Sequence, residues 1–114
     1  MQRAQQARWI ARQALIAKCY GNHLEAAKLF RDALTEAPTD CLAKYEMESS
    51  LITHGKQCVD RGLLDRAHRI FLEAASVNPR SVAALASLAT LGEAASNYVE
   101  AEILWQRILS LDPR

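Results

Sequence analysis

Apolar residues recur along the chain with the spacing of one face of a helix, and the alternation typical of a strand is absent. The pattern predicts six helices, over residues 4–20, 23–37, 40–61, 64–77, 80–95 and 97–111. Glycines and prolines, which interrupt helices, fall near the predicted boundaries except for Gly55 and Gly92. We therefore expect an all-α fold.

One spaced block of residues occurs three times. The first copy consists of Gly21, Ala26, Phe30, Ala33 and Pro38. The second consists of Gly62, Ala67, Phe71, Ala74 and Pro79, and the third, in looser form, of Ser96, Ala101, Trp105, Ile108 and Pro113. The second and third copies are 34 residues apart and the first and second are 41 apart, which is seven more. A fixed period of about 34 residues is typical of two-helix solenoid repeats.

Each copy reads as a helix, a tight turn and a second helix folded back on the first. Gly21 and Gly62 lie at the predicted turn, where a residue without Cβ can adopt positive φ. Small residues on the first helix of each copy are expected to face Ala26, Ala67 and Ala101 on the second helix, so that the two helices can approach closely. These small residues are Ala14, Gly55 and Ala89. The large rings at 30, 71 and 105 are expected to fill the space between neighbouring helix pairs, and the prolines turn the chain toward the next repeat.

This arrangement resembles the tetratricopeptide repeat family, whose 34-residue motif carries an apolar residue at position 4, Ala at 20, an aromatic at 24 and Pro at 32. The chain matches with Ile10, Leu51 and Leu85 at position 4. Gln13 and His54 occupy position 7, where the motif has Leu, and Ile108 occupies position 27, where the motif has Ala. The stretches around Phe71 and Trp105 are also similar to the half-a-tetratricopeptide (HAT) repeats of RNA-processing scaffolds.

The resemblance implies a right-handed α–α superhelix, or solenoid, of three helix-turn-helix repeats. Their boundaries are 7–40, 48–81 and 82–114, with a seven-residue insertion at 41–47. Residues 1–114 form either one such domain or a segment of a longer array.

The insertion itself favours a long helix, because seven residues are two helical turns and leave the buried face in register. Thr39 or Asp40 is a suitable N-cap for it. The alternative is a longer loop between the first two repeats. On a projecting helix, Tyr45 and Met47 would either contact a partner or cover the end of the first repeat.

Composition is that of an ordinary globular domain, with 114 residues, 50% hydrophobic content and 24% charge. No stretch approaches the apolar length that spans a bilayer, and no apolar secretory core precedes a cleavage site. The three cysteines, Cys19, Cys41 and Cys58, are odd in number and irregular in spacing, which argues against a disulfide framework. We expect an intracellular, cytoplasmic protein in a reducing compartment, with organelle targeting as the alternative.

Net charge is only +1, but the first 24 residues hold no acidic residue. They carry four basic ones, Arg3, Arg8, Arg12 and Lys18. Three interpretations stay open for this basic helix: a solvated polar face, a surface for an acidic peptide or an RNA backbone, and an organelle-targeting segment.

Catalytic and metal-binding motifs were not found, so we expect no enzyme, no cofactor and no metal site. His54 and Cys58 are four apart on one helix, but two ligands do not make a metal site. A buried, hydrogen-bonded His54 and an apolar core Cys58 are the expected alternatives.

What remains is a binding module. In the tetratricopeptide family the first helices line a concave groove, and the matching positions here give Arg8, Lys18 and Lys56 for acidic partner groups. Ile52 and Val59 are the candidate apolar anchors. The positions that hold an acidic chaperone tail in this family are occupied here by residues that cannot pair with a carboxylate: Ala11, Leu15, Thr53, Ala83 and Ser87.

The last predicted helix would leave Ile103, Leu104 and Ile108 without a following repeat to cover them. This indicates a longer array, self-association or a partner at that end. The predicted function is a protein–protein interaction scaffold or adaptor that uses its concave groove. The alternative is a structural subunit of an RNA-containing assembly whose first helix contacts phosphate.

Overall fold

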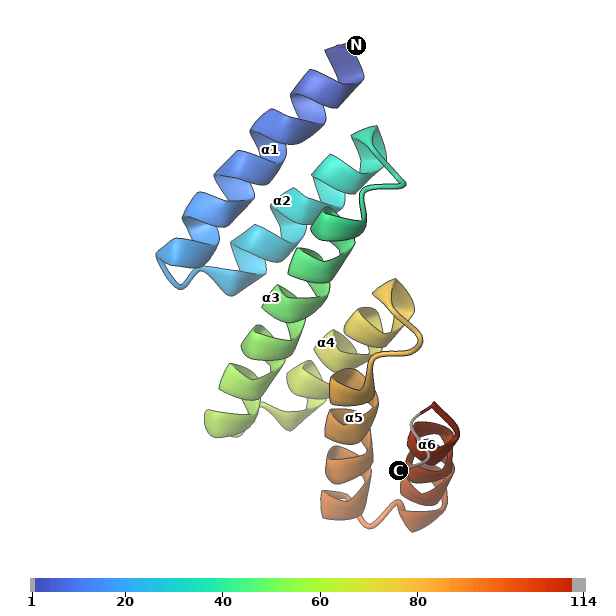
Figure 1. Cartoon of the computed structure of the whole chain (residues 1–114). Helices are drawn as coiled ribbons and strands as arrows, with labels where there is room; N and C mark the ends of the chain where they lie inside the picture. The colour runs from blue at the N-terminus through green and yellow to red at the C-terminus, as the bar shows by residue number, and fades with distance from the viewer. Residues whose placement is uncertain (1, 112–114) are drawn as a thin grey trace. The chain divides into compact units, whose positions relative to one another are not determined.

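The computed structural model describes residues 2–111, and within them the backbone forms six α-helices and no strand. The helices are α1 (Gln2–Cys19), α2 (His23–Glu36), α3 (Cys41–Asp60), α4 (Leu64–Val77), α5 (Val82–Ala94) and α6 (Tyr98–Leu111). Figure 1 shows them in chain order. Every predicted boundary lies within two residues of the observed one, so the all-α prediction is confirmed.

The chain divides into two compact units within α3. The first compact unit is Met1–His54 and the second is Gly55–Arg114. In the first, α1 packs along α2. In the second, α4 packs against α5 and α5 packs against α6.

The turn inside each repeat has one backbone conformation. φ is +80° at Gly21, +78° at Gly62 and +63° at Ser96. At the first turn the N–H of Gly21 donates to the carbonyl of Lys18 and that of Asn22 to Ala17, both at 2.9 Å. The same two bonds recur 41 residues later and again 34 residues after that. This pair of bonds closes a helix C-terminus in the Schellman manner, and the predicted turns are therefore present in all three repeats.

Side-chain caps begin the first helices of the second and third repeats. A carboxylate oxygen of Asp40 accepts from the N–H groups of Leu42 (3.0 Å) and Ala43 (3.1 Å). The hydroxyl of Ser81 accepts from the N–H of Ala84 at 3.2 Å. Pro38 and Pro79 precede these caps in the turns that end α2 and α4. Pro113, the third proline of the pattern, lies outside the described residues.

The insertion at 41–47 is part of α3, so the alternative of a longer loop is wrong. Met47 is 4% exposed and so is buried within the first compact unit, whereas Tyr45 is 64% exposed. Asp40 supplies the cap that the sequence offers, and the two added turns keep Met47 on the buried side of the helix.

Small residues lie at the helix contacts as predicted. Ala14, Ala26, Ala67, Ala89 and Ala101 are all 2% exposed or less. At Gly55 the nearest atoms across the contact belong to a ring and not to an alanine. A Cβ there would lie 2.5 Å from Cε1 of Phe71, so the ring of Phe71 lies directly against the glycine. A Cβ added at Gly92 would lie 3.5 Å from the Cβ of Ala101, so Gly92 lies close to this alanine.

The three rings do not share one environment. Phe30 and Phe71 are 2% and 1% exposed, but Trp105 is 36% exposed, so the prediction that it fills a space between helix pairs is wrong within the described residues. The indole N–H of Trp105 donates to Glu93 of α5 at 2.8 Å. Ile103 is exposed as predicted, whereas Leu104 and Ile108 are half-buried.

Candidate partner-binding groove

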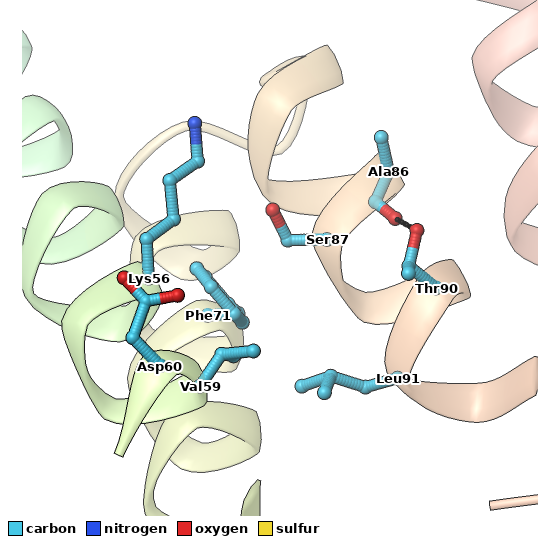
Figure 2. Close-up of a pocket in the computed structure, with 8 residues that line it drawn as sticks. All are labelled: Lys56, Val59, Asp60, Phe71, Ala86, Ser87, Thr90 and Leu91. Atoms are coloured by element: carbon cyan, nitrogen blue, oxygen red, sulfur yellow. Dashed lines mark hydrogen bonds between the residues drawn. The ribbon is translucent and has the colours of Figure 1, made fainter. Parts of the chain in front are cut away.

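A groove of about 400 Å³ opens in the second compact unit, between the end of α3 and the middle of α5. Its walls are formed by Lys56, Val59 and Asp60 from α3, Phe71 from α4, and Ala86, Ser87, Thr90 and Leu91 from α5. Figure 2 shows these eight side chains around the open space.

Helix periodicity places these side chains together. Lys56, Val59 and Asp60 are three and four residues apart, so they share one side of the last turns of α3. The groove residues of α5 follow the same spacing on a helix that Ser81 starts. Phe71 reaches the floor because Gly55 leaves room for its ring.

The floor and the two facing walls are apolar. Val59 is 37% exposed and points across the groove toward Leu91, with the buried ring of Phe71 behind them (Figure 2). An apolar side chain of a ligand inserted here would remove the exposed parts of Val59 and Leu91 from water, which is the favourable part of binding in a concave site.

The polar groups of the groove are placed at its edges. The hydroxyls of Ser87 and Thr90 donate to the carbonyls of Ala83 (2.8 Å) and Ala86 (2.9 Å), so their oxygens remain available only as acceptors. Lys56 and Asp60 stand on the α3 side as one positive and one negative charge (Figure 2). Within residues 2–111 neither of these two charges forms an ion pair.

Of the candidate site residues, the structure brings Lys56 and Val59 together in this groove. Ile52 is half-buried and belongs to the first compact unit, as do Arg8 and Lys18. Lys18 donates to Glu46 at 2.5 Å, with 31% and 16% of the two side chains exposed, so its charge is already compensated. Arg8 is exposed on α1.

In the family register, positions 2, 5, 9 and 12 of each repeat line the groove, and among the eight groove residues these are Lys56, Val59, Ala86 and Thr90. Sequence reasoning missed the other four as ligand contacts. Phe71 was assigned to the core, where its ring is indeed buried, although one edge also lines the groove. Asp60, Ser87 and Leu91 each lie one residue after a position that the family register assigns to the groove. The signal that could have found them is the width of the helix face, since residues i and i+1 both border an open groove.

Two of the four basic residues of α1, Arg3 and Lys18, form ion pairs, so α1 has fewer unpaired positive charges than the sequence suggested. Arg3 pairs with Glu36 at 3.2 Å and also donates to the carbonyl of Thr35 at 3.3 Å. With Lys18 bound to Glu46, the two other basic residues, Arg8 and Arg12, are exposed and form no ion pair with any residue between 2 and 111. The helix therefore presents two such charges.

Other chemistry finds little support in the part of the chain that is described. Between residues 2 and 111 no three His, Cys, Asp or Glu side chains gather closely enough to bind a metal ion. Cys58 is buried, as expected, whereas His54 is half-buried. Over the same residues, none of the helices has the length and apolar character needed to cross a membrane.

Comparison with known proteins supports the fold. Neither a protein-family model nor a curated protein sequence matches this chain. Among solved structures, the chain is similar to a tetratricopeptide repeat protein from Parabacteroides merdae, with a TM-score of 0.58 and 17% sequence identity. The match covers 96% of this chain and 41% of that one. The chain has a tetratricopeptide-like helical repeat fold, and it spans less than half the length of the structure it resembles.

Proposed function

We propose that the protein is an interaction module that binds a segment of another protein in the groove between α3 and α5. The observation that carries the proposal is the apolar pocket formed by Val59, Phe71 and Leu91 beside an unpaired lysine. A folded protein gains little from leaving these groups open, whereas a partner side chain would cover them.

The groove chemistry favours a particular ligand. The partner segment supplies one apolar side chain for the pocket and an acidic residue next to it for Lys56. A basic residue on the other side would meet Asp60. In this role the protein acts as a scaffold or adaptor, and the remaining candidate contacts, Arg8 and Ile52, belong to the first compact unit.

Phage display of random 12-residue peptides on the full chain tests the proposal. We expect enriched peptides that combine an apolar residue with Asp or Glu. Their affinity should fall at least about tenfold for Val59→Glu and for Lys56→Glu, because the first places a charge in the apolar pocket and the second reverses the sign at its edge.

Two matched controls come from the same chain. Val82 is 41% exposed, close to the 37% of Val59, but does not line the groove, and Lys44 is an exposed lysine of α3 outside it. Val82→Glu and Lys44→Glu should leave peptide affinity unchanged. The proposal fails if no peptide is enriched, or if the control and groove variants weaken binding equally.

The RNA alternative is the weaker candidate. It depends on the basic residues of α1, and two of the four are paired with Glu36 and Glu46. Nuclease treatment during a pull-down separates the two functions, since a partner held in the groove stays bound after the nuclease.

A further inference from the structure

A second cavity, of about 330 Å³, lies in the second compact unit between the start of α4, the end of α5 and the turn that leads into α6. We call it the α4–α5 cavity, and the residues that matter for its chemistry are Leu64, Asp65, His68, Leu88, Leu91 and Glu100. It lies at the junction of two successive repeats, and α4, α5 and the start of α6 are all described. Its walls are therefore complete within one compact unit.

Three leucines form the apolar part of the cavity. Leu88 is 4% exposed, Leu91 is half-buried and Leu64 is 46% exposed. An alkyl chain placed among them would be removed from water together with the exposed parts of Leu64 and Leu91. The cavity therefore favours a ligand with an apolar stem.

Two carboxylates border the cavity, but no lysine or arginine does. Asp65 lies in the first turn of α4 and Glu100 in the first turn of α6. Neither carboxylate forms an ion pair with any residue from 2 to 111. The groove between α3 and α5 differs, because there Lys56 accompanies Asp60. Charge complementarity thus requires a cation in the α4–α5 cavity.

An acidic residue in the first turn of a helix also stabilises the helix by itself, and Glu25 of α2 is such a residue that borders neither the groove nor the cavity. Asp65 and Glu100 differ from Glu25 because they come from two helices and border one apolar cavity. The side-chain amide of Asn97 donates to one oxygen of Glu100 at 2.6 Å, which holds the carboxylate in place.

The cation that fits is organic and not a metal ion. In the described part of the chain no three His, Cys, Asp or Glu side chains are close enough to bind a metal. An arginine side chain has an apolar methylene stem for the leucines and a planar guanidinium with several N–H donors, so it can pair with carboxylates of two helices at once. The imidazole of His68 adds a planar surface to the same cavity, on which a guanidinium can stack.

We propose that the α4–α5 cavity binds an arginine side chain of a partner protein, with its stem among the leucines and its guanidinium between Asp65 and Glu100. Leu91 borders both this cavity and the groove, so a segment held in the groove lies one side chain away. The arginine belongs to that same partner segment, and this step rests on the function proposed above.

Nuclear magnetic resonance with N-acetyl-arginine methylamide tests the cavity without any groove ligand. Added to the full chain, this compound should cause saturable shifts of the amide signals of Gly92, Ala94 and Ala95, which border the cavity. We expect a Kd on the order of millimolar, which a titration to about 20 mM resolves. N-acetyl-citrulline methylamide has the same shape without the charge, and should bind at least about tenfold more weakly.

Two double variants with the same change in charge separate the cavity from general attraction. Asp65→Asn with Glu100→Gln removes both cavity carboxylates and should abolish the preference for arginine over citrulline. Glu25→Gln with Glu102→Gln, at exposed sites outside the cavity, should retain it. Val59→Glu, which blocks the groove, should leave it unchanged, and circular dichroism checks that every variant is helical.

The source of the arginine is tested with peptides selected on the groove. A groove peptide extended by one arginine should bind the natural chain about tenfold more tightly than the same peptide with citrulline. Asp65→Asn with Glu100→Gln should make the two peptides equal, whereas the control double variant should not.

The cavity is not an arginine site if the arginine compound causes no saturable shift, if citrulline binds equally well, or if both double variants lose the preference. If the compound binds but no extended peptide gains affinity from its arginine, the assignment to the groove partner is wrong. If phage display enriches no peptide while the compound still binds, the proposed groove function and this assignment both fail, and the arginine site itself is supported.

Discussion

At the scale of single residues, the turn inside each repeat shows one backbone shape made by two different residue types. Gly21 and Gly62 adopt positive φ without a side chain, but Ser96 adopts φ of +63° with one. A Cβ in this region crowds the neighbouring carbonyl and costs about 1 kcal/mol relative to glycine. The hydrogen bonds of the turn persist at Ser96, so the surrounding helices hold it in this conformation.

Ser96→Gly is therefore expected to raise the free energy of unfolding by about 0.5–1 kcal/mol. Urea unfolding followed by circular dichroism measures the change. Ser87→Gly, inside α5, should lower it by about 0.5 kcal/mol, because there glycine only adds flexibility to a helix. If Ser96→Gly instead lowers the free energy of unfolding, the serine side chain stabilises the fold by more than its positive φ costs.

Ser50 offers a second test at this scale. It is fully buried, and within the described residues its hydroxyl oxygen has no hydrogen-bond partner. The equivalent residue of the third repeat is Ala84, which is equally buried, so the site accepts a methyl group. Ser50→Ala should raise the free energy of unfolding by about 1 kcal/mol, because folding removes the hydroxyl from water without giving it a hydrogen bond in the protein. Unchanged or lower stability in thermal unfolding would indicate a bound water or an alternative rotamer.

The environment of a single residue could be predicted where it depends on neighbouring residues in the sequence, and not where it depends on residues of another helix. The turn glycines could be predicted, because positive φ is a local property of the chain. The contact between Gly55 and Phe71 could not, since the alanine pattern indicated a different neighbour across the helix pair. Trp105 could not be placed either, because the burial of a ring at its position depends on the helix that follows.

At the scale of elements, α3 demonstrates why the helices were predictable. Asp40 provides a cap and the next helix-breaking turn lies beyond Asp60, so nothing in the insertion favours a loop. Two extra turns keep Met47 in register with the buried side. Local signals therefore fix the helix ends, whereas partners such as Lys18 and Glu46, 28 residues apart, depend on the fold.

The contact between α3 and α4 gives a prediction for this scale. Gly55→Ala would place a methyl group 2.5 Å from the Phe71 ring, so the ring or the helix must move. We expect a loss of about 1–2 kcal/mol from overpacking, even though alanine favours the helix itself. Chemical denaturation gives the value, and Gly92→Ala, whose Cβ would have ordinary contacts of 3.4 Å or more, should not destabilise in this way.

A second variant separates overpacking from other causes. Phe71→Leu removes the ring edge, so Gly55→Ala should cost less in the Phe71→Leu background than in the natural chain. Equal costs in the two backgrounds would mean that the ring is not what the glycine accommodates.

At the scale of the whole molecule, the candidate groove was predicted in part. The repeat register brought Lys56 and Val59 to its wall without any structure, because the helix face that a repeat exposes recurs with its period. The ion pairs that Arg3 and Lys18 form could not be predicted, because their partners, Glu36 and Glu46, lie in other helices. This difference changes the balance between a protein partner and RNA.

That balance can be measured from the salt dependence of any RNA binding. The net charge is +1, and among the residues that the structure describes Arg8 and Arg12 are the basic side chains of α1 without an ion pair. Each cation that contacts a phosphate of single-stranded RNA contributes about −0.7 to the slope of log K against log salt, so two give about −1.4. We expect filter binding or fluorescence anisotropy with oligouridine to show weak affinity and a slope no steeper than this. The double variant Arg8→Gln with Arg12→Gln should bring the slope close to zero. A slope of about −3 or steeper for the natural chain would mean that Arg3 and Lys18 leave their ion pairs to contact phosphate. That result would favour the RNA-assembly function over peptide binding in the groove.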